Sequence, residues 1–131
     1  MTGWDNFWDA VFEIRRHDPG FDEDAYVFVM DALEFTVSSA GERRHISAAE
    51  LLDGLCRCAK ARFGLMAWTV LERWGIETTA DIGTIVFQLV ESGILARQEG
   101  DSRADFDHVM NLQKVLEEDY FETPDDAFGE S

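Results

Sequence analysis

Two capping boxes fix where two helices of this chain begin. In a capping box, a Ser or Thr side chain accepts a hydrogen bond from the backbone three residues later, and the acidic side chain there reaches back. Ser47 and Glu50 are spaced for one such pair, and Thr78 and Asp81 for a second. The sequence therefore predicts helices directly after Ser47 and Thr78, and the other elements must pack around them.

Apolar residues recur at helical spacing along most of the chain. Steps of three and four residues place side chains on one face of a helix. The pattern predicts helices over about residues 4–16, 22–40, 48–63, 65–74 and 79–92. Glycines, which commonly end helices, lie at positions 41, 64, 75 and 93.

Two short apolar runs after the last of these helices are typical of strands. Ile94 to Gln98 and Phe106 to Met110 flank the polar residues 99–105, as in a β-hairpin. Helices followed by a hairpin have the order of a winged helix-turn-helix.

These elements define the expected fold. A chain of 131 residues, 46% of them hydrophobic, is about one domain and can bury a core. We expect a mainly α (α+β) fold, a helical domain over residues 1–121 with a winged helix-turn-helix-like segment at residues 43–110 and a small antiparallel β-hairpin. Residues 122–131 are expected to form a flexible acidic tail.

Acidic residues far outnumber basic ones, which bears on the partners that the chain can attract. There are 27 Asp and Glu against 11 Lys and Arg, for a formal net charge of −16. This charge opposes attraction to phosphate backbones and to anionic lipid. A nucleic-acid partner is therefore disfavoured, and no membrane contact is expected.

The charge is also unevenly distributed. The net charge is −8 over residues 1–42, +3 over residues 43–73 and −11 over residues 74–131. We expect the bases of the middle segment to pair within the chain, for example Arg57 with Asp53 one turn earlier. The alternative is a small face for an anion or an acidic partner, formed by Arg57, Lys60 and Arg62.

Nothing in the sequence indicates a membrane or secreted protein. No run approaches the roughly 18 consecutive apolar residues of a membrane helix, and residues 2–13 contain acids where a signal peptide has a basic end. Cys56 and Cys58 lie two residues apart on a predicted helix, where side chains diverge, so no disulfide is expected between them. Reduced thiols fit a cytoplasmic protein, which is the expected location.

The helix over residues 80–92 is the one that would read DNA in a winged helix. Its polar positions are Asp81, Thr84, Gln88 and Glu91. A major-groove helix places Arg, Lys, Asn or Gln there, surrounded by phosphate-binding bases. Only Thr84 and Gln88 suit that role, so direct DNA binding by this helix is disfavoured.

None of the common catalytic or phosphate-binding motifs is present. The chain lacks G-x-S-x-G, G-x-x-x-x-G-K and G-x-G-x-x-G, and its 3 histidines lack H-x-x-x-H spacing. The densest cluster of potential ligands, Asp101 to His108, has Phe106 where a calcium loop needs glycine. We therefore predict that the protein is not an enzyme and holds neither a cofactor nor a metal ion.

Aromatic residues gather on the first predicted helix. They are Trp4, Phe7, Trp8 and Phe12. They either cover the core of their own domain or anchor a protein partner or a second copy of the chain, because aromatic side chains dominate binding hot spots. The acidic C-terminal stretch, with Tyr120, Phe121 and Phe128, has the acid-plus-aromatic pattern of a segment that folds onto a basic partner.

Short motifs spread over residues 20–112 resemble one bacterial family. They are Arg44-His45-Ile46-Ser47, Glu50-Leu51-Leu52-Asp53-Gly54, Phe63-Gly64, Met66-Ala67, Trp74-Gly75-Ile76, Asp81-Ile82-Gly83, Ile85-Val86-Phe87, Leu89-Val90-Glu91 and Asp101-Ser102-Arg103-Ala104-Asp105-Phe106. The combination resembles the Minf-type family of small acidic proteins from planctomycete and verrucomicrobial genomes. The resemblance implies a bacterial cytosolic protein and carries no catalytic residues across.

Taken together, these patterns favour a non-enzymatic protein–protein interaction or regulatory module. Acids on the would-be reading helix, an aromatic first helix and an acidic tail all point to protein contacts. The alternative is a winged-helix DNA-binding regulator related to transcription, which would use the basic segment at residues 43–73.

Overall fold

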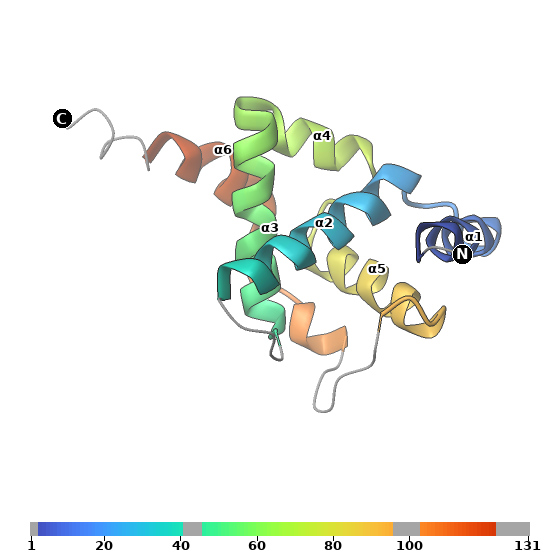
Figure 1. Cartoon of the computed structure of the whole chain (residues 1–131). Helices are drawn as coiled ribbons and strands as arrows, with labels where there is room; N and C mark the ends of the chain where they lie inside the picture. The colour runs from blue at the N-terminus through green and yellow to red at the C-terminus, as the bar shows by residue number, and fades with distance from the viewer. Residues whose placement is uncertain (1–2, 41–45, 96–102, 123–131) are drawn as a thin grey trace.

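A computed structural model describes residues 3–40, 46–95 and 103–122, with side chains over residues 6–39, 46–95 and 103–117. Helices account for most of these residues. They are α1 (Gly3–His17), α2 (Glu23–Ala40), α3 (Ala48–Phe63), α4 (Ala67–Arg73), α5 (Thr79–Glu91) and α6 (Leu112–Glu122), with short 3-10 turns η1 (Gly64–Met66) and η2 (Arg103–Phe106) (Figure 1).

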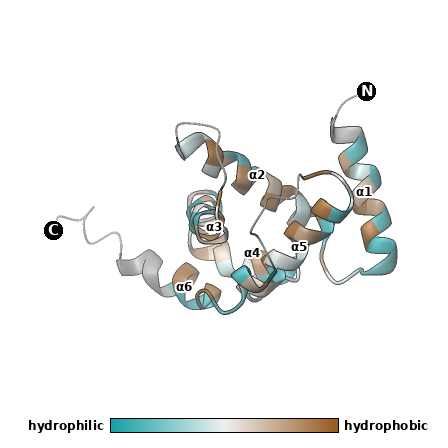
Figure 2. Cartoon of the chain, turned by 90° about the horizontal axis from the view of Figure 1, so that it is seen from below, coloured by the Kyte–Doolittle hydropathy of each residue, from teal (hydrophilic) through white to brown (hydrophobic). Residues whose placement is uncertain are grey.

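The middle of the molecule is formed by α2, α3, α4 and α5. Helix α2 crosses in front of α3, and α4 extends from the upper end of α3, above α2 in this view (Figure 1). Helix α1 packs against α2 and α5, whereas α6 packs against α3 and α4. The first and last helices therefore lie at opposite ends, as Figure 2 shows from below. Among the helices described, none has the length and apolarity needed to cross a membrane.

Both predicted capping boxes are confirmed. At the start of α3, the Glu50 backbone N–H donates to Ser47 Oγ at 3.1 Å, and the Ser47 N–H donates to Glu50 Oε1 at 3.0 Å. At the start of α5, Thr78 and Asp81 make the equivalent pair at 3.2 and 3.1 Å. Each box satisfies backbone N–H groups that have no partner inside the helix.

The core lies where these helices meet. Its largest fully buried side chains are Tyr26, Phe28, Leu52, Leu55, Leu71, Ile76, Ile82, Ile85, Leu89, Leu112 and Leu116. They come from α2, α3, α4, α5 and α6 and from the α4–α5 connection, so every one of these elements contributes to one core. Helix α1 adds Phe7 and Val11 at one end.

The predicted β-hairpin is wrong, and with it the (α+β) class and the winged helix-turn-helix-like segment. The described part of the chain is helical and contains no strand. Phe106 ends η2, and residues 107–110 continue as a turn, in which His108 has a φ of 52°. Ile94 and Leu95 lie in the bend after α5, and residues 96–102 lie outside the described residues.

Packing of Phe106 explains why the second run does not form a strand. A Cβ placed on Gly83 of α5 would lie 2.7 Å from the Phe106 Cβ, so the two residues are in direct contact. The Phe106 ring also meets the Phe87 ring edge to face at 6.5 Å. This anchors the single turn of η2 against α5, and tertiary packing overrides the strand pattern.

Helix α6 follows the turn and was not predicted. Its start is capped by Asn111, whose side-chain oxygen accepts the Lys114 N–H at 2.9 Å. Leu112 and Leu116, one turn apart, are buried against the rest of the core. The helix carries the backbone to Glu122, and the proposed tail beyond it lies outside the described residues.

Candidate functional site

Helix α1 has apolar residues on two neighbouring sides. Phe7 and Val11, one turn apart, are only 2% and 1% exposed. Trp8 and Phe12, each one residue further, are 42% and 68% exposed. The aromatic residues of α1 therefore differ in position. Phe7 covers the core, and Trp8 and Phe12 face solvent. The side chain of Trp4 lies outside the described residues.

A hydrogen-bond network holds the end of α1 to the domain. Arg15 Nε donates to the Phe21 carbonyl at 2.8 Å. Gln88 on α5 donates to Asp18 at 3.1 Å and accepts from the Tyr26 hydroxyl at 2.7 Å. Three elements, the α1–α2 turn, α2 and α5, are thereby tied together.

The Tyr26 hydroxyl is a stable donor in this network. Burial, helped by the nearby Asp18 carboxylate and opposed by Arg15, raises the pKa of Tyr26 to about 12. The hydroxyl therefore keeps its proton throughout the neutral range and can donate to Gln88.

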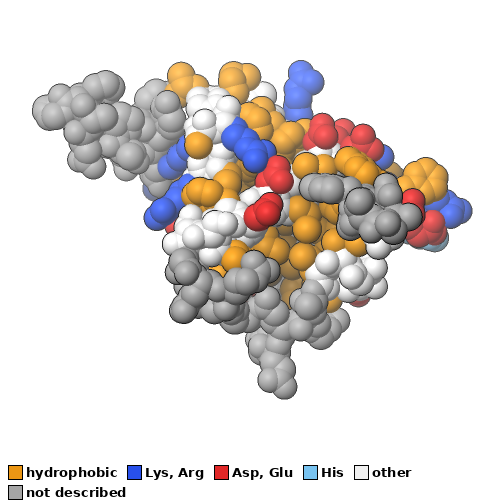
Figure 3. All heavy atoms as spheres, viewed as in Figure 1, with side chains coloured by type: hydrophobic (Ala, Val, Ile, Leu, Met, Phe, Trp, Pro, Cys, Tyr) orange, Lys and Arg blue, Asp and Glu red, His pale blue; other side chains and the backbone are white. Residues whose placement is uncertain are grey.

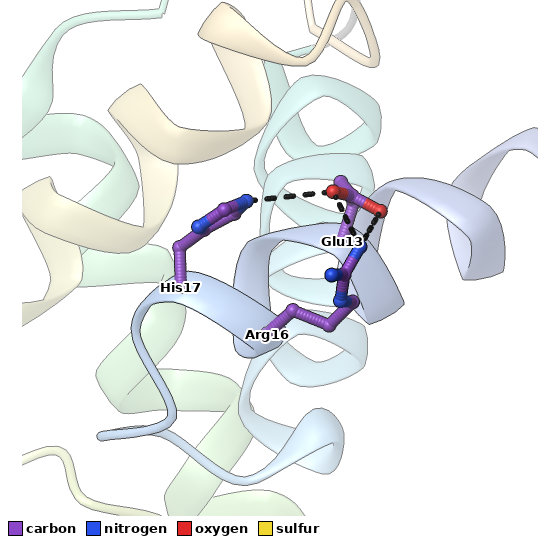
Figure 4. A network of polar contacts seen from close by, with 3 residues as sticks. All are labelled: Glu13, Arg16 and His17. Atoms are coloured by element: carbon purple, nitrogen blue, oxygen red, sulfur yellow. Dashed lines mark hydrogen bonds and ion pairs between the residues drawn. The ribbon is translucent and has the colours of Figure 1, made fainter.

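Charged side chains flank Phe12 on the outer side of α1. Glu13 binds Arg16 at 3.1 Å and lies 3.4 Å from His17, all from the last two turns of the helix (Figure 4). These contacts are solvent-exposed, so each is worth about 0–1 kcal/mol. Within the described residues, Asp9 makes no ion pair.

The candidate basic face is largely neutralised within the chain. Arg57 pairs with Asp53 at 3.0 Å, as predicted, and Arg62 pairs with Asp31 of α2 at 3.1 Å. Arg62 also lies over the Phe28 ring, 5.6 Å from its centroid. Lys60 is partly buried and has no ion pair among the described residues. Arg62 turns toward α2, so the structure does not join all three bases into one face.

Thr84 and Gln88, the two residues of α5 whose side chains suited contacts with DNA bases, form hydrogen bonds within the chain. Gln88 is bonded to Tyr26 and Asp18, and Thr84 accepts from Arg103 at 2.6 Å while donating to the Ala80 carbonyl at 3.2 Å. Both side chains therefore serve internal contacts.

Surface hollows lie elsewhere on the described part of the molecule. A small one of about 230 Å³ between α2 and α3 is lined by Phe35, Thr36, Ser39, Glu50, Asp53, Gly54 and Arg57. A larger one of about 590 Å³ is lined by Trp68, Glu77, Thr78, His108, Met110, Asn111, Leu112 and Gln113. Over the residues described, no three His, Cys, Asp or Glu side chains come together to hold a metal ion.

Sequence reasoning missed a second exposed apolar pair. Leu65 and Met66 lie in η1, at the corner between α3 and α4, and both are exposed. The pattern placed them inside a helix over residues 65–74, whereas α4 starts only at Ala67. Gly64, with a φ of 54°, is the signal that α3 ends before them.

The two cysteines of α3 lie inside the molecule. Cys56 and Cys58 are buried and are not joined by a disulfide. Burial raises the pKa of the Cys58 thiol, and nearby Arg62 opposes the change only in part. A protonated, buried thiol is a poor nucleophile, which fits small core residues.

No protein-family model, curated protein or solved structure matches this chain. The resemblance to the Minf-type family therefore stays a prediction.

Proposed function

We propose that this protein is a non-enzymatic interaction or regulatory module that binds another protein through the outer side of α1. The observation that carries the proposal is the 68% exposure of Phe12, one residue after the buried Val11. Trp8 adds a second exposed ring one turn away. Full burial of one such side chain is worth about 1.5–3 kcal/mol, so a partner that covers both gains substantial binding energy.

The two exposed rings lie on a well-anchored helix. Phe7 and Val11 bury the neighbouring side of α1, and the Trp8 ring meets the Phe7 ring edge to face at 5.1 Å. Arg15 and Asp18 fix the end of the helix through their hydrogen bonds. Binding to a preorganised surface loses less conformational entropy, which favours affinity.

A protein partner agrees with the charge better than a nucleic acid does. The formal net charge is −16, and Arg57 and Arg62 of the basic segment are already paired with carboxylates. Cys56 and Cys58 form no disulfide, which supports a cytoplasmic location for this interaction.

The test is affinity capture with the full chain as bait. Wild-type protein is compared with Phe12→Ser and with the matched control Leu65→Ser, which removes another exposed apolar side chain, from the α3–α4 corner. We expect a specific partner to be lost with Phe12→Ser and retained with Leu65→Ser, while circular dichroism shows both variants folded. A partner set unchanged by Phe12→Ser would contradict the proposal.

Two further measurements separate the other outcomes. Light scattering over a range of concentrations shows whether the partner is a second copy of the chain, in which case the mass falls to the monomer value in Phe12→Ser. Low-salt titration with duplex DNA tests the alternative function. DNA binding that weakens in Arg57→Glu/Lys60→Glu would favour a DNA-binding protein instead.

A further inference from the structure

The described arginines are mostly engaged within the chain, whereas several carboxylates are not. Arg15, Arg16, Arg57, Arg62 and Arg103 each contact a carbonyl, a carboxylate or a hydroxyl of the same chain. Exposed acids without an ion pair in the described part include Asp9 of α1, Glu23 of α2 and Glu91 of α5. The surface therefore has unbalanced negative charge to offer a partner.

On α1 this charge runs beside the exposed aromatics. Trp8 and Phe12 are one turn apart, and Asp9 and Glu13 directly follow them, also one turn apart. Residues four apart lie on one face of a helix, so α1 presents an apolar row and an acidic row side by side. Figure 3 shows acidic side chains next to hydrophobic ones at the α1 end of the molecule.

We propose that the partner segment of this surface is a basic amphipathic helix, with Lys or Arg side chains beside its apolar stripe. This inference rests on the proposed function and specifies the chemistry of the partner. The apolar stripe covers Trp8 and Phe12, and the bases reach Asp9 and Glu13. Glu13 can accept a new base because its contacts with Arg16 and His17 are exposed and weak.

The net charge of the chain disfavours a second copy of the chain as the partner at this surface. A second copy of the chain would bring another −16 to an already acidic surface. Like charges at an interface cost binding energy and slow association, whereas complementary charges accelerate it.

The test uses three labelled synthetic peptides of about four helical turns and the full chain. The first places Leu in one stripe with Lys on both sides, the second replaces every Lys with Glu, and the third scrambles the first so that the stripe is lost. Fluorescence anisotropy measures their Kd. We expect only the first peptide to bind strongly, with an affinity that falls as salt is raised.

Matched variants of the chain locate the contact. Asp9→Lys and Glu34→Lys change the net charge equally, but Glu34 lies on α2, as an exposed residue with no ion pair among those described. We expect about a tenfold increase in Kd for Asp9→Lys and less than about twofold for Glu34→Lys. Phe12→Ser should abolish binding of the first peptide.

Each contrary result overturns the inference. If the scrambled peptide binds as well as the first, the attraction is a non-specific one between a basic peptide and an acidic protein. Equal effects of Asp9→Lys and Glu34→Lys on Kd would lead to the same conclusion. Binding of the Glu peptide would reverse the proposed chemistry. If none of the peptides binds while Phe12→Ser still loses a captured partner, the inference fails and the proposed function stands. If Phe12→Ser retains both the peptide and the captured partner, the inference and the proposed function both fail.

Discussion

Gly54 of α3 lies directly against the side chain of Thr36 of α2, and this contact sets how closely the two helices approach. A Cβ on Gly54 would overlap Thr36 Oγ1. The hydroxyl cannot simply turn away, because it donates to the Ala32 carbonyl at 2.8 Å in a buried position. The missing side chain of Gly54 therefore allows α2 and α3 to pack as closely as they do.

Gly54→Ala should lower the free energy of unfolding by about 1–3 kcal/mol, because overpacking forces the helices apart. Gly20→Ala is the control, since a Cβ there meets only Asp18 Oδ1 at 3.4 Å, an ordinary contact. Urea denaturation of both variants measures the difference. Equal stability of Gly54→Ala and wild type would show that α2 and α3 can adjust without cost.

Tyr26 makes a prediction about alkaline pH. Its pKa is about 12 in the folded chain against 10 in the unfolded chain. Above pH 10 the unfolded state loses the proton while the folded state keeps it, so this residue stabilises the fold fully below about pH 10 and ceases to do so as the pH rises toward 12.

The measurement is the free energy of unfolding at several pH values from about 9 to 12, for wild type and Tyr26→Phe. The variant cannot ionise at this position, so its stability should fall less steeply over that interval, although it is lower at pH 9 because Gln88 loses a donor. Parallel curves for the two proteins would contradict the assigned role of Tyr26.

At the scale of the elements, the helix starts after Ser47 and Thr78 are determined locally. Ser47→Ala should destabilise the protein by about 1 kcal/mol, because the Glu50 N–H loses its acceptor. Ser38→Ala, at an exposed position within α2, is the matched control and should change stability little. Thermal unfolding of the pair measures the effect, and an unaffected Ser47→Ala would show that the cap contributes nothing.

Elements with local signals could be predicted from the sequence, and those decided by distant contacts could not. The starts of α3 and α5 follow from side chains within four residues, and both predictions were confirmed. The run from Phe106 to Met110 reads as a strand, but its structure depends on Phe106 packing against Gly83, more than twenty residues earlier. Helix α6 was missed for the same reason, because Leu112 and Leu116 are buried only by the other helices.

The same limit applies to the candidate site. The sequence identified Phe7, Trp8 and Phe12 as candidates but could not assign each to the core or to solvent. Their positions differ by only one residue step, and the boundary between the two sides of α1 depends on how the helix docks on α2 and α5. Pairing of Arg57 with Asp53, four residues away, was predictable, whereas pairing of Arg62 with Asp31 required the fold.

At the scale of the whole molecule, two features combine. The helices form one core with α1 at one end, and the chain carries a formal net charge of −16. The exposed rings of Trp8 and Phe12 lie beside acidic side chains. A basic partner with an apolar surface is therefore the class of protein that this end of the molecule attracts.

The central claim is that a protein contacts the outer side of α1, and site-specific photo-crosslinking tests it most directly. A photoreactive phenylalanine analogue replaces Phe12 in one full-length variant and Phe35, an exposed residue of α2, in another. After irradiation in living cells, the account predicts a discrete crosslinked product at position 12 and none at position 35. The absence of a product at position 12, or the same product at both positions, would contradict it.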